Sequence, residues 1–201
     1  MKKHWNLKYI IARLWQKIYT RKHPDSPWMT AEVIKLLDQL IMPSDKGIEF
    51  GSGRSTRWFA SRCSYLISVE NNKEWYNYVS KQLDSLKNVD YHYKLVNTSS
   101  PAHSEYLDPI NSLADESMDF IINDGKLRDY VAIHSISKLK NGGIYILDDA
   151  ERYLPNDLKL PSSLGNKELN TNWILFKQET EHWRKIWTTD GVSSTLLLFK
   201  I

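Results

Sequence analysis

The sequence is short of several features that would point to particular classes of protein. Its single cysteine, Cys63, excludes an internal disulfide and fits a reducing compartment, so we expect a cytoplasmic location. The longest apolar run near the N-terminus, residues 9–12, stops at Arg13 and is too short to cross a membrane. The six histidines show no metal-ligand spacing. A single domain with a full core is the expectation for 201 residues.

Acidic residues are missing from the first 24 residues, which contain seven Lys and Arg. Because the whole chain carries +3 and this segment +7, the remaining residues carry −4, which does not suit the phosphates of a nucleic acid. We therefore divide the chain into a basic N-terminal helix and linker, residues 1–24, and a domain of residues 25–201.

Apolar residues recur at helical spacing in the basic segment and predict an amphipathic helix over residues 6–20. They are Leu7, Ile10, Ile11, Leu14, Trp15 and Ile18. Three interpretations remain open. The helix packs on its own domain or over the site, it contacts a second copy in a homo-oligomer, or residues 1–22 lie on an anionic membrane.

The rest of the chain is organised around a Gly-x-Gly turn at residues 51–53. An apolar strand, residues 48–50, precedes the turn, and Ser55 or Thr56 predicts the N-cap of a following helix. Glycines let a ligand approach the main chain closely, and a helix start directs unpaired N–H groups at it. The third glycine of a dinucleotide-binding fingerprint is missing, because Thr56 stands in its place.

Two acids accompany the turn. Glu49 lies two residues before Gly51, inside the apolar strand. Glu70 ends the next strand, residues 65–69, where a carboxylate can accept hydrogen bonds from a ribose diol. Together with the turn, these acids predict a nucleoside-binding α/β domain.

Strand-like and helix-like segments alternate along the chain, which predicts an α/β fold with a doubly wound, mostly parallel sheet of seven strands. The strands are expected at residues 48–50, 65–69, 91–96, 118–122, 144–147, 183–188 and 194–200. Helices are expected at residues 30–41, 72–86, 128–138 and 172–181, and a turn at 141–143. Asp190-Gly191 predicts that the last two strands form an antiparallel hairpin.

Polar residues or glycines follow all five of the strands expected to be parallel. They are residues 51–53, Glu70, residues 97–99, Asn123 with Asp124, and Asp148 with Asp149. Open α/β sheets bind ligands beyond the carboxyl ends of their strands. These residues therefore predict one site, and the loops 99–117 and 151–170 are expected on its substrate side.

The acid-x-Gly-x-Gly turn with the acid after the second strand resembles class I S-adenosylmethionine-dependent methyltransferases. The terminal hairpin belongs to the same sheet plan. Over residues 25–201 the chain resembles more closely a group of small bacterial methyltransferases whose substrates are mostly unassigned. Residues 48–60, 68–70, 75–76, 124–125, 128 and 142–153 carry this resemblance.

The resemblance implies S-adenosylmethionine as cofactor and a role for each matching residue. Glu49, Gly51, Ser52 and Gly53 would surround the methionine part, with Ser55 and Thr56 at the helix start; Glu70 and Asn71 would hold the ribose; Thr98 or Ser99 would lie near the adenine; and Asn123 and Asp124 would face the amino-acid end and the methyl group.

Acids after the fourth and fifth strands are the candidate catalytic bases: Asp124, Asp148 and Asp149, with Arg128 or Lys126 as charge partner. Asp148 and Asp149 fit helix N-caps equally well. Catechol-type methyltransferases hold Mg²⁺ with acids at these strand ends, but they place Asp-Asn where this chain has Asp148-Asp149. Magnesium therefore stays an alternative, and we assign no metal ligand.

We predict a methyltransferase that acts on a small-molecule acceptor at oxygen. The acidic body argues against a nucleic-acid partner, and so does the absence of proline after Asn123-Asp124, where enzymes that methylate base amines carry an Asn/Asp-Pro-Pro-aromatic motif. Two alternatives remain. One is a nicotinamide-dependent oxidoreductase on a Rossmann sheet, which the missing glycine and the hairpin disfavour. The other is a non-catalytic methyltransferase-like module at the membrane surface.

Overall fold

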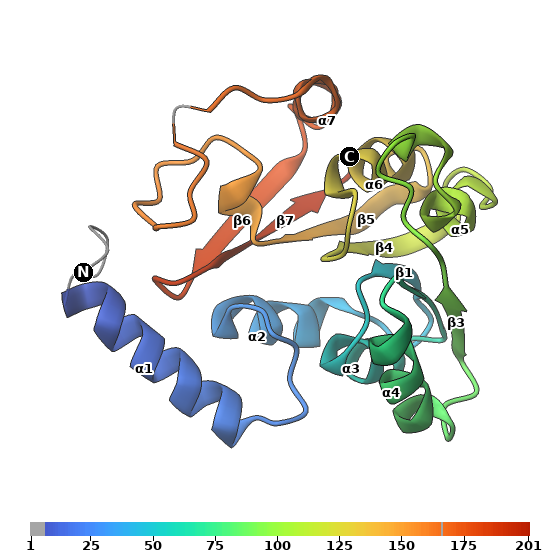
Figure 1. Ribbon diagram of the computed structural model, residues 1–201, viewed down its shortest axis with the longest axis horizontal. Helices are drawn as coiled ribbons and strands as arrows, with labels where there is room; N and C mark the ends of the chain where they lie inside the picture. The colour runs from blue at the N-terminus through green and yellow to red at the C-terminus, as the bar shows by residue number, and fades with distance from the viewer. Residues whose placement is uncertain (1–6, 166) are drawn as a thin grey trace.

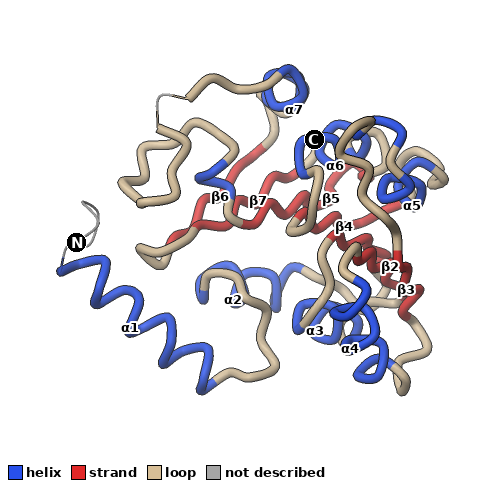
Figure 2. The backbone as a smooth tube through the Cα atoms, in the orientation of Figure 1, coloured by secondary structure: helices blue, strands red, loops and turns tan. Residues whose placement is uncertain are grey.

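A seven-stranded sheet with helices on both faces forms the centre of the molecule in a computed structural model, which describes residues 7–165 and 167–201 (Figures 1 and 2). The strands are β1 Lys46–Phe50, β2 Tyr65–Glu70, β3 Val89–Tyr93, β4 Met118–Asn123, β5 Leu139–Asp148, β6 Arg184–Thr189 and β7 Ser194–Phe199. The α-helices are α1 Leu7–Lys22, α2 Ala31–Leu40, α3 Arg54–Ala60, α4 Lys73–Leu83, α5 Asp108–Asn111, α6 Arg128–Ser135 and α7 Thr171–Glu179. Short 3₁₀ turns are η1 Pro101–His103, η2 Glu105–Leu107 and η3 Ala150–Arg152.

The strand order is β3-β2-β1-β4-β5-β7-β6. Strands β1 to β5 pair in parallel, whereas β7 pairs antiparallel with both β5 and β6. The expected doubly wound sheet with a terminal antiparallel hairpin is confirmed. The chain winds outward from β1 in one direction to β3 and in the other through β4, so β1 and β4 flank the switch point of the sheet.

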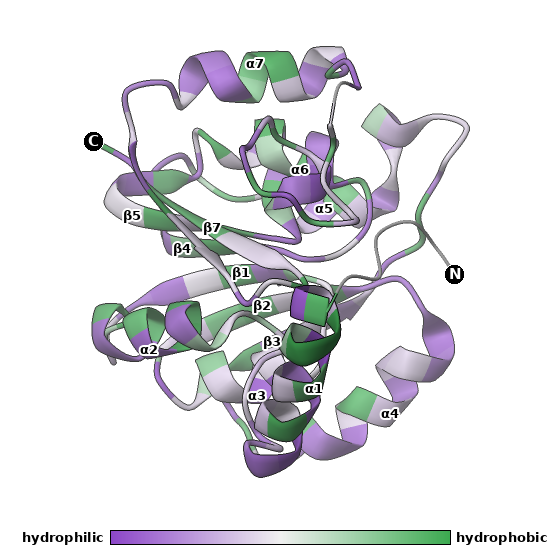
Figure 3. Ribbon diagram, turned by 90° about the vertical axis from the view of Figure 1, so that its left-hand side faces the viewer, coloured by the Kyte–Doolittle hydropathy of each residue, from purple (hydrophilic) through white to green (hydrophobic). Residues whose placement is uncertain are grey.

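Helices cover both faces of the sheet because its central strands are apolar on both sides. Helix α2 buries Val33 and Leu37 against one face, together with Trp58 and Phe59 of α3. On the other face α6 and α7 pack over β4 and β5, with Phe176 against Tyr145 at 5.1 Å between ring centroids. Figure 3 shows these two helical layers above and below the sheet.

Two strands differ from their predicted bounds by more than two residues at one end. Strand β3 covers residues 89–93 rather than 91–96, because its pairing with β2 ends where Glu70 lies opposite Tyr93. Strand β5 starts at residue 139 and contains the turn predicted at residues 141–143. There Gly142 adopts a φ of 80°, and its N–H donates to the carbonyl of Lys200, so the glycine bends the strand without ending it.

Helix α1 lies along one edge of the molecule, next to the turn between β6 and β7 (Figure 1). The Gln16 side-chain amide donates to Asp190 of that turn at 2.9 Å. Residues 1–6 of the predicted segment lie outside the described residues, and the division at residues 24 and 25 remains a prediction. Among the described helices, none has the length and apolar character needed to cross a membrane.

Candidate functional site

Two neighbouring cavities of about 440 and 750 Å³ lie beyond the carboxyl ends of β1, β2 and β4. Both are lined by Ser52 of the glycine turn and by Asp124, the residue that follows β4. The larger cavity also reaches Glu70, and extends along the start of α6 to Tyr153. Strand β1 pairs with β2 on one side and β4 on the other, and this pairing brings the three strand ends together.

The glycine turn packs directly against the end of β4. Gly51 has a φ of 92°, and a Cβ built on it would lie 2.8 Å from the carbonyl oxygen of Asp124. Its own N–H donates to Val69 of β2, while the N–H of Asp124 donates to Phe50. A side chain at position 51 would push the two strand ends apart, so glycine is required there both for backbone angle and for space.

Helix α3 begins at Arg54, one or two residues before the predicted start. Gly53 rather than Ser55 or Thr56 occupies the N-cap position, because the Thr56 hydroxyl accepts the Gly53 N–H at 3.0 Å and so caps the helix from inside its first turn. Thr56 is fully buried, whereas Ser55 lines the smaller cavity. Of the two, only Ser55 is placed to meet a ligand.

Glu49 is fully buried beneath the turn. Its Oε2 accepts hydrogen bonds from the hydroxyls of Thr56 at 2.6 Å and Ser68 at 2.8 Å, while its Oε1 has no protein partner. Burial raises the pKa of Glu49 to about 7, against the lowering effect of these hydroxyls. The carboxyl therefore supports the turn from below and does not line either cavity.

Glu70 is held in place by main-chain amides. Its Oε1 accepts the N–H groups of Asn71 at 2.8 Å and Asn72 at 2.7 Å, and its Oε2 accepts the N–H and hydroxyl of Ser52 at 3.2 and 3.0 Å. The Ser52 hydroxyl also lies 2.6 Å from the Tyr91 hydroxyl. Glu70 and Asn71 both line the larger cavity, and Glu70 links the end of β2 to the glycine turn.

Asp124 and Arg128 form an ion pair just beyond the C-terminal end of β4. Arg128 Nη2 lies 2.6 Å from Asp124 Oδ1, and Arg128 also donates to the carbonyls of Gly125 and Asp148. Its guanidinium lies 5.1 Å from the ring centroid of Tyr153. Burial raises the pKa of Asp124 to about 6 although Arg128 opposes the change, and a third of the Asp124 side chain remains exposed.

Several predicted site residues lie elsewhere. Asn123 is fully buried, and its amide donates to the Arg128 carbonyl and the Tyr145 hydroxyl, so it holds β4, β5 and α6 together behind the cavities. Thr98 and Ser99 are exposed in a loop that Asn97 closes by accepting the Ser99 N–H, and they line neither cavity. The three side chains therefore lie outside the two cavities, and their contact with a cofactor remains a prediction.

Asp148 and Asp149, at the end of β5, have different environments. Asp148 is buried and accepts the Thr195 hydroxyl of β7 at 2.7 Å; burial raises its pKa well above the usual value. Asp149 precedes η3 with a φ of 51° and pairs with Arg152 at 3.2 Å. Neither lines the two cavities, and neither side chain caps the 3₁₀ turn.

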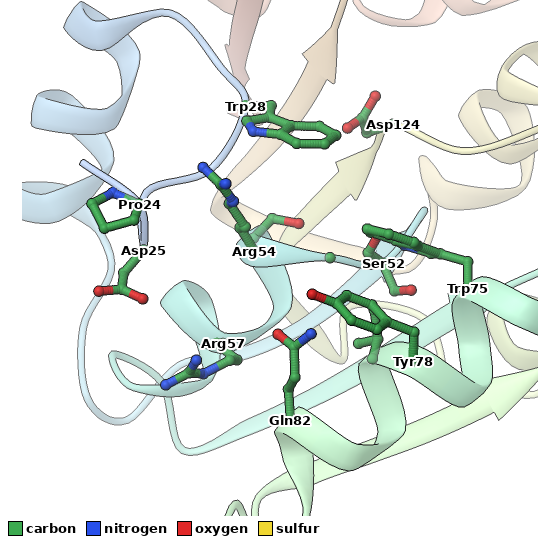
Figure 4. A pocket seen from close by; sticks show the side chains of 13 residues that line it. Pro24, Asp25, Trp28, Ser52, Arg54, Arg57, Trp75, Tyr78, Gln82 and Asp124 are labelled. Atoms are coloured by element: carbon green, nitrogen blue, oxygen red, sulfur yellow. The ribbon is translucent and has the colours of Figure 1, made fainter. Parts of the chain in front are cut away.

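Aromatic residues that the sequence analysis did not assign to the site form much of the cavity wall (Figure 4). Trp28 and Trp75 line both cavities, and Tyr78 joins them in the smaller one. Trp75 of α4 is partly exposed, and its indole N–H donates to the Ser52 carbonyl at 2.8 Å. The sequence contains eight Trp and eleven Tyr, but helical periodicity alone does not separate the aromatic residues of the core from those that line a cavity.

Arg54 lies beside Trp28 in the same wall. Its guanidinium carbon is 5.4 Å from the Trp28 ring centroid, and its buried Nη1 has no hydrogen-bond partner in the protein. Figure 4 shows this guanidinium between Pro24 and Trp28, at the edge of the smaller cavity. A buried cationic donor without a partner is a candidate contact for an anionic ligand group.

The described residues do not offer the ligands of a catechol-type magnesium site. In residues 7–165 and 167–201, no group of three or more His, Cys, Asp or Glu is arranged to hold a metal. Asp124 is paired with Arg128, and Asp148 is bonded to Thr195.

Comparison with solved structures decides the fold family. A methyltransferase-like protein from Silicibacter pomeroyi aligns with a TM-score of 0.59 and 14% identity, over 88% of this chain and 89% of that one. SMU.1697c of Streptococcus mutans, a putative methyltransferase in complex with SAH, aligns with a TM-score of 0.54 and 11% identity, over 83% and 94%. An rRNA methylase from Streptococcus thermophilus aligns with a TM-score of 0.51 and 10% identity, over 83% and 93%.

This chain has the fold of the class I S-adenosylmethionine-dependent methyltransferases. Neither a protein-family model nor a curated protein matches its sequence. The two cavities of this chain lie at the switch point of the sheet, at the ends of β1 and β4.

Proposed function

We propose that the protein is an S-adenosylmethionine-dependent methyltransferase that acts on a small-molecule acceptor at oxygen. One observation carries the proposal. The glycine turn, Glu70 and Asp124 all line the larger cavity, which lies at the switch point of a methyltransferase-like sheet. Ligands of open α/β sheets bind at such points.

The residues present fit the cofactor. Glu70 and Ser52 face the larger cavity as acceptor and donor for a ribose diol, and a ribose hydroxyl would replace the Ser52 hydroxyl on Glu70. Ser52 then keeps Tyr91 as its partner. The unpartnered Nη1 of Arg54 would take the carboxylate of the amino-acid end, and Trp75 would cover the ligand. Glu49 would reach the ammonium group only through water, because it is buried.

The bound cofactor would supply an activated methyl group on a sulfonium. The protein's part is to align the acceptor and to remove its proton. Asp124 faces both cavities, and with a pKa of about 6 its carboxylate is ionised at neutral pH and can accept the proton of an acceptor hydroxyl. Arg128 holds this carboxylate in position. Asp148 and Asp149 are weaker candidates because they do not line the cavities.

The residues that line the smaller cavity suit a small acceptor. Trp28, Trp75 and Tyr78 offer flat apolar surfaces, and Arg54 offers a cation beside them. The net charge of −4 over residues 25–201 disfavours RNA, although one structural neighbour is an rRNA methylase. RNA is therefore included with small hydroxylated acceptors in the acceptor screen.

Calorimetric titration of the purified protein with S-adenosylhomocysteine tests the proposal, with NADH as the comparison ligand and each titration repeated with Mg²⁺. We expect micromolar binding of S-adenosylhomocysteine and none of NADH. Binding of NADH alone would favour the oxidoreductase alternative. Binding of neither would remove the enzyme hypothesis and leave the non-catalytic alternative.

A further inference from the structure

Most of the apolar face of α1 is turned away from the protein, and Trp15 at its edge also borders a cavity between α1 and the β6–β7 turn. Six of its side chains are between 37% and 72% exposed, and none of the residues of α1 is buried. These six are Leu7, Ile10, Ile11, Leu14, Trp15 and Ile18. Their spacing places them on one side of the helix. Figure 3 shows apolar and polar segments alternating along α1, as this spacing requires.

A different side of the helix holds it against the domain. Gln16 donates to Asp190, and the Cβ of Ala12 lies 3.1 Å from the position that a Cβ on Gly191 would take. Ala12, Gln16 and Tyr19 are partly buried along this side. The contact with the β6–β7 turn therefore orients α1 so that its apolar side faces solvent.

Basic residues border the exposed apolar side on both flanks. At 100° per residue, Arg13 and Lys17 lie along one flank and Lys8 along the other, while Arg21 and Lys22 stand at the C-terminal end of the apolar side itself. The helix contains no acidic residue. This is the arrangement of a helix that lies in a membrane interface, because apolar side chains enter the acyl boundary while Lys and Arg reach the headgroups.

We propose that α1 attaches the protein to an anionic lipid surface, lying in the plane of the interface. The charge pattern selects this occupant over a second copy of the chain. Two α1 helices packed face to face would bring their basic flanks together with no acid on either helix to pair with them. Phospholipid headgroups of negative charge supply the missing partner.

The linker gives the attachment a consequence for the site. Residues 23–30 connect α1 directly to α2, and within them Pro24 and Trp28 line the smaller cavity. A membrane-bound α1 therefore holds one wall of this cavity close to the lipid surface. The attachment itself does not depend on methyl transfer and can be tested separately.

Co-sedimentation of the full-length protein with vesicles tests the proposal. We expect binding to vesicles of phosphatidylglycerol and phosphatidylcholine, weak binding to phosphatidylcholine alone, and loss of binding at high salt. The double variants Ile11→Ser/Leu14→Ser and Arg13→Glu/Lys17→Glu should each bind at least about tenfold more weakly. These positions are exposed, so thermal melting should match the wild type.

Matched controls change the same residue types elsewhere on the surface. Ile174→Ser/Leu175→Ser alters two exposed apolar residues of α7, and Lys81→Glu/Lys87→Glu makes the same change of net charge near α4. Both controls should bind vesicles like the wild type.

The proposal is overturned if the wild type does not bind anionic vesicles, or if controls and α1 variants lose binding equally. A dimer in sedimentation velocity that the Ile11→Ser/Leu14→Ser variant dissociates, without vesicle binding, would assign the face to a second copy.

Discussion

At the scale of single residues, the two acids that accompany the glycine turn differ in environment. Glu70 is satisfied on both oxygens by N–H and hydroxyl donors at the cavity wall. Glu49 is buried, and one of its oxygens has no partner. Glu70 is therefore placed where the proposed ligand would lie, whereas Glu49 supports the turn from inside the protein.

Replacing Glu70 by alanine should weaken S-adenosylhomocysteine binding about 10- to 100-fold, because a hydrogen bond to a charged group contributes about 1.5–3 kcal/mol. Calorimetry measures the effect, and Glu179→Ala on the exposed surface of α7 is the control. Since Glu70 also holds main-chain amides, Glu70→Gln serves if the alanine variant does not fold. It should bind with intermediate affinity. Unchanged affinity in both variants would contradict the ribose role.

Glu49 should make the protein less stable as pH rises from about 4.5 to 7. Its pKa is about 7 in the folded protein against an ordinary 4.5, so in this window the folded state keeps a proton that the unfolded state releases. The free energy of unfolding should fall by about 3 kcal/mol across the window through this group. Glu49→Gln should remove that share of the slope.

Urea unfolding of the wild type and Glu49→Gln at several pH values between 4.5 and 8 measures the difference. Asp124 titrates in the same window, so the comparison between the two proteins, rather than the wild-type slope alone, isolates Glu49. Parallel pH dependences in the two proteins would mean that the folded-state pKa of Glu49 is not raised.

At the scale of elements, the β1–turn–α3 unit depends on its contact with the end of β4. The turn is tight because Gly51 has a positive φ, and it is fixed because Asp124 and Gly125 lie against it. The first turn of α3 is capped by its own Thr56, which also bonds Glu49 below. The unit therefore positions Ser52 and Arg54 without any contribution from the ligand.

Gly51→Ala should destabilise the protein by about 2–5 kcal/mol, because left-handed backbone strain adds to a clash with the carbonyl of Asp124. Gly142→Ala is the matched control: its φ of 80° is similar, but nothing lies within 4 Å of the added Cβ. We expect about 1–2 kcal/mol for that variant. Equal losses in urea unfolding would show that close packing at the turn adds nothing.

At the scale of the whole molecule, α1 is attached more loosely than the other long helices. It contributes no buried residue and contacts the rest of the chain through the β6–β7 turn and through Tyr19, which packs against the edge of one core. Helices α2 and α6, by contrast, are anchored in the two cores. The linker that follows is different, since Pro27, Met29 and Thr30 are buried. The division of the chain at residue 24 can be tested on this basis.

A protein that lacks residues 1–24 should fold and melt cooperatively, with a midpoint within a few degrees of the full chain, because the two cores remain intact. Differential scanning calorimetry makes the measurement. The Met29→Ala variant of the full chain provides the contrast, since it removes a buried side chain and should melt lower. A large drop on truncation would place α1 within the domain.

Local chemistry determined much of this protein. Apolar strands, a glycine turn and an Asp-Gly turn predicted the sheet and its terminal hairpin. Glu70, predicted at the end of a strand, lines the larger cavity. These features depend on backbone angles and side-chain alternation within a few residues, which the sequence encodes directly. The cytoplasmic location and the acceptor remain predictions.

Tertiary structure decided which polar residues meet the crevice. Asn123 and Asp148 are polar residues at strand ends like Asp124, but their side chains are buried against Tyr145 and Thr195, partners more than twenty residues away in sequence. Trp28 and Arg54 reach the cavity because the linker after α1 crosses the start of α3. Side-chain burial depends on which distant elements pack together, and local sequence spacing carries no record of that packing.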